Sequence, residues 1–373
     1  MRKYDIAAYV WPAYTGEEKR TRMFWPEGMG EWQTVKNSVK KFPAHSWPRK
    51  PVWGYVNEAD PYVMEMEIEA AVDHGVNVFI YDWYWYENAP FLENCLNHGF
   101  LKAKNRNKMK FFLMWANHDV NHTWDIRLSW DQEDIIWKGA VGRKEFENIC
   151  RRIIRKYFRE VNYYCIDGKP VFQIYDLRNL VKGLGGIQET RDALNWFQEE
   201  VRKEGFPGVH LQLTIYGNAL NLSGIDNSNG NTKENMASYL GFESVSHYQF
   251  VHFTNIDRDY SDILNDVKAE WKSLEHMYRL PYFPHISVGW DNNPRFLGIR
   301  EGVVKNNTPD MFKKGLQMAR EYLDNHKSQV PLITINSWNE WTETSYLEPD
   351  DLYGYGYLDA VKEVFLSDTP GEN

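Results

Sequence analysis

The feature that most constrains the fold is a repeat of short apolar runs, each followed by a longer charged and amphipathic stretch. This alternation is typical of strand–helix units around a parallel sheet, because parallel strands are buried on both faces and the helices cover them. The chain contains eight such runs. We expect strands at 5–10, 76–82, 109–115, 170–175, 209–215, 242–247, 283–288 and 331–336.

Helices are expected between these strands, at 61–74, 143–159, 187–204, 258–278 and 310–325. Asp60-Pro61 and Thr308-Pro309 each place a capping residue before a proline suited to the first helical position. Because no linker interrupts the eight repeats, we predict a single (β/α)8 TIM barrel over 1–366 with long loops on its C-terminal face. The tail at 367–373 is expected to fray. A doubly wound sheet is the alternative fold.

The overall charge argues against several classes of partner. A net charge of −9 is unfavourable for binding nucleic acid or an acidic membrane surface.

The three cysteines, Cys95, Cys150 and Cys165, are an odd number and have no CxxC spacing. This pattern favours reduced thiols and does not indicate a zinc site. The first apolar run is too short for a secretory signal, and no run is long enough to span a membrane. We expect a cytoplasmic protein without a cofactor, secreted or periplasmic if a leader is removed, and the sequence does not indicate an oligomeric state.

Polar and aromatic residues gather just after the expected strands, which is where barrel enzymes carry their chemistry. They include Trp11, Tyr14, Tyr84, Trp85, Trp115, Asn117, His118, Tyr175, Asp176, Tyr216, Asn218, Tyr248, Trp290, Asp291, Trp338, Asn339 and Trp341. Aromatic residues make up 16% of the chain, and their rings suit a site that is apolar on one face and wet on the other. The long segment 11–58 is expected to cover part of the mouth, with a mobile loop at 217–231 on the same face.

The stretch NSWNEWTETSYLEPD at 336–350 contains the acids that we expect to be catalytic. Glu340 and Glu343 can share a pocket if the chain turns after Asn336, since residues three apart in a turn have Cβ atoms about 5–6 Å apart. Two such carboxyl groups in an indole-walled cleft can separate in pKa, one protonated and one ionised. Glycoside cleavage requires this pair, because an acid must protonate the leaving oxygen while a carboxylate assists at the sugar.

The residues around these acids suit a sugar, whose C–H face packs on aromatic rings and whose hydroxyls need polar partners. Our substrate-binding candidates are Trp11, Trp32, Asp82, Tyr84, Trp115, Asn117, His118, Tyr248, Trp290, Asp291 and Asn339. We expect Trp11, Trp115 and Trp290 to form stacking walls and Asn117, His118, Asp291 and Asn339 to hold hydroxyls. Capping is the alternative role for the polar residues of the W-N-E-W string, and a hydrogen-bonded rim carboxylate is the alternative for Asp82. His118, Asp119 and His122 could suggest a metal, but the HExxH order is absent and we expect none.

The chain resembles the WbsX-like glycosyltransferase family, which is itself similar to glycoside hydrolase family 99, the endo-α-mannosidases. The matching motifs are WGYVNEADPYVMEMEIEAAVDHGVNVFIYDWYWY at 53–86, FFLMWANHD at 111–119, GWDNNPR at 289–295, NTPDMF at 307–312 and INSWNEWTETSYLEPDDLYGYGYLDAV at 335–361. The resemblance implies a retaining cleavage in which the substrate's own 2-hydroxyl attacks C1, with Glu340 as base and Glu343 as acid.

The chain departs from the family pattern at three places. Thr344 stands where a glycine is expected, His118 follows Asn117 in place of the usual glutamate, and Asp82-Trp83 replaces an aromatic pair. These departures affect the expected pocket wall and leave the sugar, its linkage and endo or exo action open. A glycosyltransferase and a non-catalytic carbohydrate-binding barrel are the alternatives to hydrolysis, although the chain has no DxD string or Gly-rich phosphate loop.

Overall fold

A parallel barrel forms the centre of the computed structural model, which describes residues 3–16, 18–215 and 233–366. Its strands are β1 (Asp5–Val10), β2 (Val78–Tyr86), β4 (Lys110–Trp115), β6 (Lys169–Ile174), β7 (His210–Thr214), β8 (Ser244–Ser246), β9 (Tyr282–Phe283), β10 (His285–Ser287) and β11 (Leu332–Asn336). They pair in the order β10-β11-β1-β2-β4-β6-β7-β8-β9, and β9 and β10 are separated only by Pro284. Because proline lacks the N–H that a sheet ladder uses, it divides the seventh expected strand into two halves. The predicted TIM barrel is confirmed.

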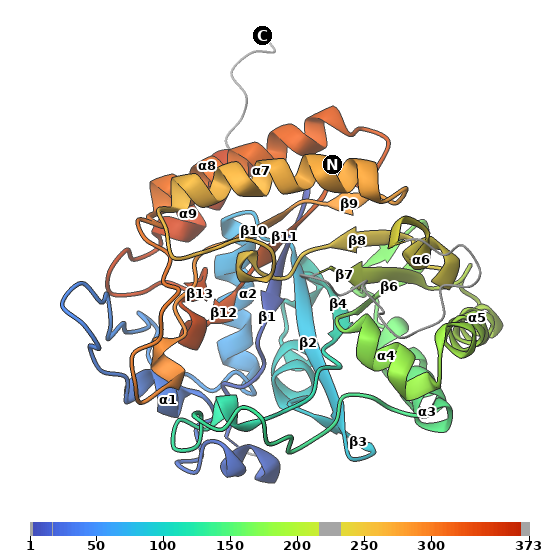
Figure 1. Cartoon of the computed structure of the whole chain (residues 1–373), viewed down its shortest axis with the longest axis horizontal. Helices are drawn as coiled ribbons and strands as arrows, with labels where there is room; N and C mark the ends of the chain where they lie inside the picture. Colours follow the sequence, from blue (N-terminus) through green and yellow to red (C-terminus); the bar gives the residue numbers. More distant parts are fainter. Residues whose placement is uncertain (1–2, 17, 216–232, 367–373) are drawn as a thin grey trace.

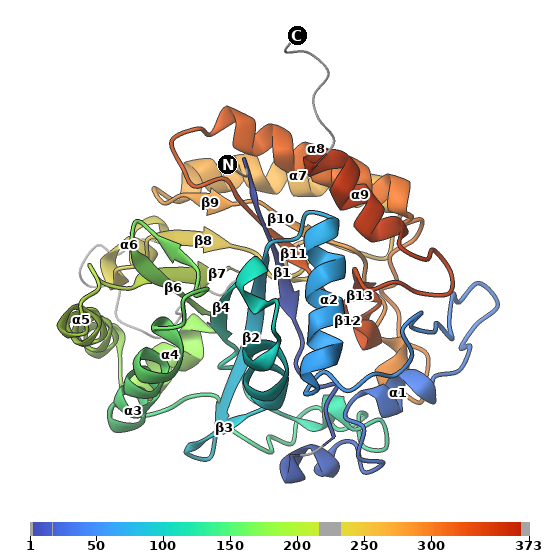
Figure 2. The same cartoon turned by 180° about the vertical axis from the view of Figure 1, so that it is seen from behind.

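The helices form the outer layer. They are α2 (Pro61–Asp73), α3 (Arg143–Ile153), α4 (Leu177–Leu184), α5 (Ile187–Lys203), α6 (Lys233–Leu240), α7 (Tyr260–Met277), α8 (Pro309–Asn325) and α9 (Gly356–Phe365). Figures 1 and 2 show α7, α8 and α9 together on one side of the barrel and α3, α4 and α5 on another. The capping signals act as expected, since the Asp60 side chain accepts from the Tyr62 N–H and Thr308 accepts from that of Met311.

Most of the short elements lie at the C-terminal ends of the strands. The hairpin strand β3 (Ala89–Phe91) pairs with β2, and β12 (Asn339–Glu340) pairs with β13 (Ser345–Tyr346). Short helical turns include α1 (Trp32–Lys36), η5 (His122–Trp124), η8 (Asn293–Arg295) and η9 (Trp341–Glu343), while β5 (Cys165–Ile166) lies at the start of β6. The expected loop at 217–231, Tyr216, Asn218 and the tail at 367–373 lie outside the described residues.

Polar side chains fill part of the barrel interior and satisfy one another. Gln173 donates to Tyr9 at 2.9 Å and to Thr214 at 2.7 Å. The Thr334 hydroxyl is 2.9 Å from both Ser246 Oγ and His285 Nδ1. His285 is fully buried, and burial lowers its pKa well below the ordinary value. A neutral imidazole in a hydrogen-bonded layer therefore lies beneath the mouth of the barrel.

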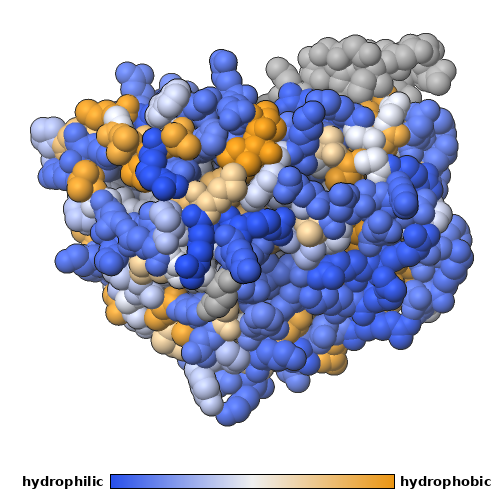
Figure 3. All heavy atoms as spheres, turned by 90° about the horizontal axis from the view of Figure 1, so that it is seen from below, coloured by the Kyte–Doolittle hydropathy of each residue, from blue (hydrophilic) through white to orange (hydrophobic). Residues whose placement is uncertain are grey.

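The face shown in Figure 3 is mostly hydrophilic, with hydrophobic residues in small scattered groups. In the part of the chain that the structure describes, none of the helices combines the length and apolar character needed to cross a membrane.

The hydrogen bonds of Thr334 make a testable contribution to stability. Thr334→Val keeps the side-chain shape but leaves His285 Nδ1 without this partner, so it should lower the free energy of unfolding by about 1–3 kcal/mol. The matched control is Thr190→Val in α5, because the Thr190 hydroxyl only donates to the Gly186 carbonyl one turn earlier. Urea denaturation measures both. Equal losses in the two variants would contradict a stabilising polar layer.

Candidate active site

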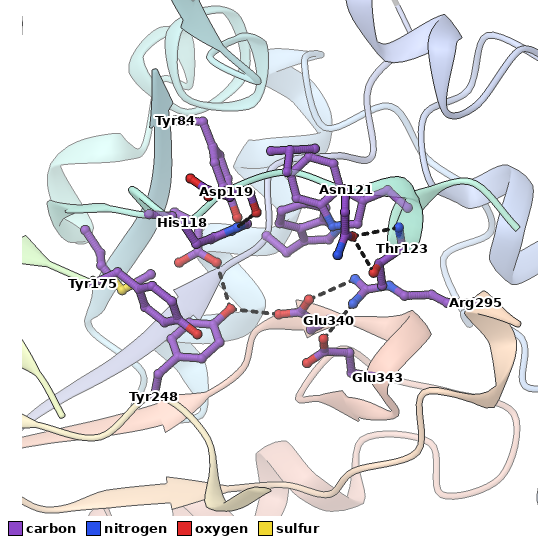
Figure 4. A pocket seen from close by; sticks show the side chains of 16 residues that line it. Tyr84, His118, Asp119, Asn121, Thr123, Tyr175, Tyr248, Arg295, Glu340 and Glu343 are labelled. Atoms are coloured by element: carbon purple, nitrogen blue, oxygen red, sulfur yellow. Dashed lines mark hydrogen bonds and ion pairs between the residues drawn. The ribbon is translucent and has the colours of Figure 1, made fainter. Parts of the chain in front are cut away.

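A cavity of about 250 Å³ opens at the C-terminal end of the barrel (Figure 4). Its lining comes from at least six strand ends and loops, as expected for a barrel enzyme. The lining residues are Trp11, Asp82, Tyr84, Met114, Ala116, His118, Asp119, Val120, Asn121, Thr123, Trp124, Tyr175, Tyr248, Arg295, Glu340 and Glu343.

The turn expected after Asn336 brings both glutamates into this cavity. The Ser337 hydroxyl accepts from the Glu340 N–H at 2.7 Å and donates to the Ser345 carbonyl at 2.6 Å, which ties the start of the turn to its end. Thr344 closes η9 with φ of 56°. A β-branched residue rarely adopts this left-handed conformation, which explains why glycine is expected at the position.

Arg295 holds the two glutamates through a single guanidinium. Its Nη1 donates to Glu343 Oε1 at 2.6 Å, its Nη2 donates to Glu340 Oε1 at 3.0 Å, and its Nε donates to Glu31 Oε1 at 3.0 Å. Arg295 is 5% exposed and Glu31 is fully buried, so little water screens these ion pairs. Figure 4 shows Arg295 reaching Glu340 and Glu343 from the side opposite Tyr248.

Burial raises the pKa of both glutamates, and the positive charge of Arg295 lowers it. Burial, the neighbouring Glu340 carboxylate and Glu31 together raise the pKa of Glu343 to about 8, although Arg295 opposes the shift. Burial also raises the pKa of Glu340, which Arg295 and the Tyr248 hydroxyl lower. Glu340 therefore has two donors that favour its ionised form, whereas Glu343 is favoured as the protonated member of the pair.

Aromatic rings surround the carboxyl groups. The Trp11 ring lies 5.6 Å from that of Tyr84 and 5.2 Å from that of Trp124, between ring centroids. On the other side, the Tyr175 ring lies 5.4 Å from Tyr248, edge to face. His118 lies between the two groups, 5.7 Å from Tyr84 and 5.8 Å from Tyr175. Burial lowers the pKa of His118, so the imidazole is neutral at pH 7. Its Nδ1–H donates to the Asp119 carbonyl at 2.9 Å, which leaves Nε2 as an acceptor.

Of the residues predicted from the sequence, the structure brings seven to the cavity: Trp11, Asp82, Tyr84, His118, Tyr248, Glu340 and Glu343. The remaining six lie outside its lining. Trp115 packs its ring 6.2 Å from Phe146 of α3, on the outer side of the barrel. Trp32 lies in α1 with its indole N–H bonded to the Val56 carbonyl, and Trp290 packs half-buried at the edge of the core.

The three polar candidates outside the cavity are engaged by protein groups. Asn117 bonds both the N–H and the carbonyl of Asp176, each at 2.7 Å. Asp291 accepts from Asn293 and lies 2.9 Å from His45. Asn339 bonds both backbone groups of Trp11, which matches the capping-type alternative for the W-N-E-W string. These residues position the loops that carry the cavity.

Three buried acids hold the W-N-E-W turn from behind. Trp338 donates to Glu67, Asn339 donates to Glu58, and Trp341 donates to Glu348. In the described part of the chain this is the group of three ligand-type side chains close enough to hold a metal ion, with one oxygen from each within 4.8 Å of the others. Burial raises the pKa of Glu58 to about 8 and those of Glu67 and Glu348 well above the ordinary range. The raised pKa values favour protonated carboxyl groups beneath the turn, where Glu67 Oε1 and Glu348 Oε1 have no hydrogen-bond partner among the described residues.

The residues considered for a metal from the sequence do not converge. His118 bonds the Asp119 carbonyl, Asp119 accepts from Gly139 and Asn179, and His122 lies 3.1 Å from Asp134.

Arg295 is the main residue of the cavity that the sequence interpretation missed. The motif GWDNNPR contains Arg295, the first Lys or Arg after β10 in the sequence. Arg295 lies in η8, several residues beyond the end of β10, so its position after the strand does not indicate that it reaches the cavity. The loop at 119–124, which supplies Asp119, Val120, Asn121, Thr123 and Trp124, was considered only for a metal.

Comparison with known proteins shows the fold and the family. The endo-α-mannosidase of glycoside hydrolase family 99 from Bacteroides thetaiotaomicron superimposes with a TM-score of 0.59 at 13% identity, over 97% of this chain and 96% of that one. A structure described as a glycoside hydrolase-like protein gives a TM-score of 0.63 at 16% identity, over 98% and 94% of the two chains. The fold is that of a glycoside hydrolase-like barrel.

The chain belongs to the family described as Glycosyltransferase WbsX, whose model matches residues 6–361. Among curated proteins, it is 24% identical over 354 residues to WxcX of Xanthomonas campestris pv. campestris, an uncharacterised protein. This match covers 91% of the chain and 47% of WxcX, so the chain spans about half the length of the curated relatives it matches.

The buried acids predict an unusual dependence of stability on pH. Because the raised pKa of Glu67 keeps its proton in the folded state, unfolding releases that proton above the unfolded pKa near 4.5, and stability falls as pH rises. Glu67→Gln mimics the protonated group and should remove about 1.4 kcal/mol per pH unit of this loss between pH 6 and 8. Urea denaturation at several pH values tests it, with the exposed Glu133→Gln as control. An unchanged slope would contradict a protonated Glu67.

Proposed function

We propose that the protein is a glycoside hydrolase that cleaves a glycosidic bond in a poly- or oligosaccharide. The observation that carries this proposal is the pair of carboxyl groups, Glu340 and Glu343, held on one guanidinium in an aromatic-lined cavity. Their opposing environments separate the proton donor from the base, which is what glycoside cleavage requires. The aromatic walls and the neutral His118 suit a sugar ring, and a cavity of about 250 Å³ suits one sugar unit better than a longer segment.

In the first step, the Glu340 carboxylate takes the proton of the substrate's 2-hydroxyl, and that oxygen attacks C1. The bond from C1 to the leaving oxygen breaks, and Glu343 supplies the proton to the leaving group. In the second step, water attacks C1 of the resulting 1,2-anhydro sugar. Glu343 takes a proton from this water, and Glu340 returns its proton to the 2-oxygen, so the configuration at C1 is retained overall. The resemblance to glycoside hydrolase family 99 supports this route, and the raised pKa of Glu343 fits its role as the acid.

The family description makes transfer from a nucleotide sugar the second candidate function. Such a donor carries a diphosphate, which needs cationic partners. Among the described residues that line the cavity, Arg295 is the one Lys or Arg, and its three nitrogens already contact carboxylates of Glu31, Glu340 and Glu343. The site is therefore better suited to a neutral sugar than to a nucleotide diphosphate. Incubation with a panel of polysaccharides and nucleotide sugars separates the two, since hydrolysis produces reducing ends and transfer releases nucleotide.

The two glutamates should differ when each is neutralised. Glu340→Gln and Glu343→Gln keep the side-chain volume, and each should lower turnover by about 10²–10⁴ because one proton-transfer group is lost. A substrate with an acidic leaving group should rescue Glu343→Gln, which lacks only leaving-group protonation, and should do little for Glu340→Gln. Steady-state kinetics on both substrates measure this difference, with the exposed Glu133→Gln as control.

Two results would contradict the assignment. Equal rescue of both variants would remove the separate roles of acid and base. Cleavage of a 2-deoxy substrate at the normal rate, or capture of a sugar covalently bound to Glu340, would replace the 2-hydroxyl with an enzyme nucleophile.

A further inference from the structure

The Tyr248 hydroxyl lies between two carboxyl groups. It is 2.8 Å from Asp82 Oδ2 and 2.9 Å from Glu340 Oε2, and both distances are those of hydrogen bonds. A tyrosine hydroxyl carries one hydrogen and an ionised carboxylate carries none. Two hydrogen bonds in this bridge therefore require a second hydrogen, which must belong to one of the two carboxyl groups.

The surroundings identify Asp82 as the group that carries this hydrogen. Glu340 has Arg295 at 3.0 Å, whereas the guanidinium forms its ion pairs within the described structure with Glu31, Glu340 and Glu343 and not with Asp82. Asp82 is 2% exposed, and its second oxygen, Oδ1, is buried without a hydrogen-bond partner among the described residues. An ionised carboxylate in such a place would be a buried charge without compensation.

The groups facing Asp82 and Glu340 from every packed element support the same assignment. They are Tyr9 on β1, Tyr14 after β1, Tyr84 on β2, Tyr248 after β8, Glu343 in η9, Arg295 in η8 and Glu31 before α1. Burial and then the Glu340 charge raise the pKa of Asp82 well above its usual range. No positive charge among these groups contacts Asp82 in the described structure.

We propose that Asp82 is a neutral carboxylic acid which donates its hydrogen to Tyr248, so that Tyr248 donates to the Glu340 carboxylate. The bridge makes Asp82 a positioning residue for the base. Because a hydroxyl that accepts a hydrogen bond becomes a stronger donor, the bridge favours the ionised form of Glu340. The role of the bridge in the reaction rests on the proposed function, whereas the protonation of Asp82 does not.

Infrared difference spectroscopy tests the protonation without any need for activity. At pH 7, the spectrum of the native protein minus that of Asp82→Asn should contain the carbonyl band of a protonated carboxyl group. If this difference spectrum instead contained the bands of an ionised carboxylate, the proposal would be overturned. Tyr248→Phe removes the acceptor of the Asp82 hydrogen and should shift the same band, and an unmoved band would show that Asp82 does not donate to Tyr248.

Kinetics test the effect on Glu340 through the sign of a shift. The acidic limb of the pH profile of kcat/KM reports the base, whose activity is lost as pH falls through its pKa. Asp82→Ala should lower kcat/KM by about tenfold or more and move this limb to higher pH, because Tyr248 becomes a weaker donor. Asp82→Asn, whose amide can donate to Tyr248, should move the limb less and lose less activity. If Asp82 were ionised, both substitutions would remove a like charge and move the limb to lower pH, which would overturn the proposal.

The two readouts separate failure of this inference from failure of the proposed function. A protein that cleaves no glycan but shows the protonated band would refute hydrolysis and retain the neutral Asp82. A protein that cleaves glycans and shows the carboxylate bands would retain hydrolysis and refute the bridge.

Discussion

The contact of one buried guanidinium with three carboxyl groups is the interaction on which the rest of the site depends. Arg295 comes from η8, Glu31 from the long segment after β1, and Glu340 and Glu343 from the turn after β11. A buried cation is tolerated only if it is paired, and these acids are equally costly to bury without the cation. Segments separated by more than two hundred residues are therefore held together at the mouth by mutual charge compensation. The same contacts set the balance between burial and positive charge that separates Glu340 from Glu343.

Behind the cavity, a second group of acids explains why the W-N-E-W string contains two tryptophans and an asparagine. Trp338, Asn339 and Trp341 point away from the cavity and donate to Glu67, Glu58 and Glu348. The one residue of the string that enters the cavity is Glu340. The indoles thus act as hydrogen-bond donors and as a hydrophobic support, because Trp341 also stacks on Tyr346 at 3.8 Å between centroids. A rigid turn of this kind is what a pair of catalytic side chains needs to keep its geometry.

The apolar runs were sufficient to predict the strands, because parallel strands buried on both faces are mostly apolar, and the polar residues among them, such as Gln173 and Thr334, bond other polar residues inside the barrel. The site was harder, since a position after a strand indicates the correct end of the barrel and not the direction of the side chain. On β2, Asp82 and Tyr84 line the cavity, whereas Trp83 between them donates outward to Glu93. On β4, Met114 lines the cavity and Trp115 faces α3. The two-residue alternation of a strand could have separated these residues. It could not have found Arg295, whose position depends on the path of a loop.

The three departures from the family pattern differ in what their side chains contact. Thr344 adopts the conformation that favours glycine, but its hydroxyl accepts from Trp47 at 2.8 Å and donates to the Asp291 carbonyl at 3.0 Å. These bonds offset part of the strain and tie the segment 11–58 to the turn, and Thr344 does not line the cavity. His118 and Asp82 do line it, and burial shifts the pKa of each toward its neutral form. His118 stands where the family pattern has a glutamate, so its neutral imidazole adds no negative charge to the acids already present, whereas Asp82 stands where the pattern has an aromatic residue. Under the proposed hydrolysis, we therefore expect His118 and Asp82, the two departures that line the cavity, to affect which sugar the site accepts.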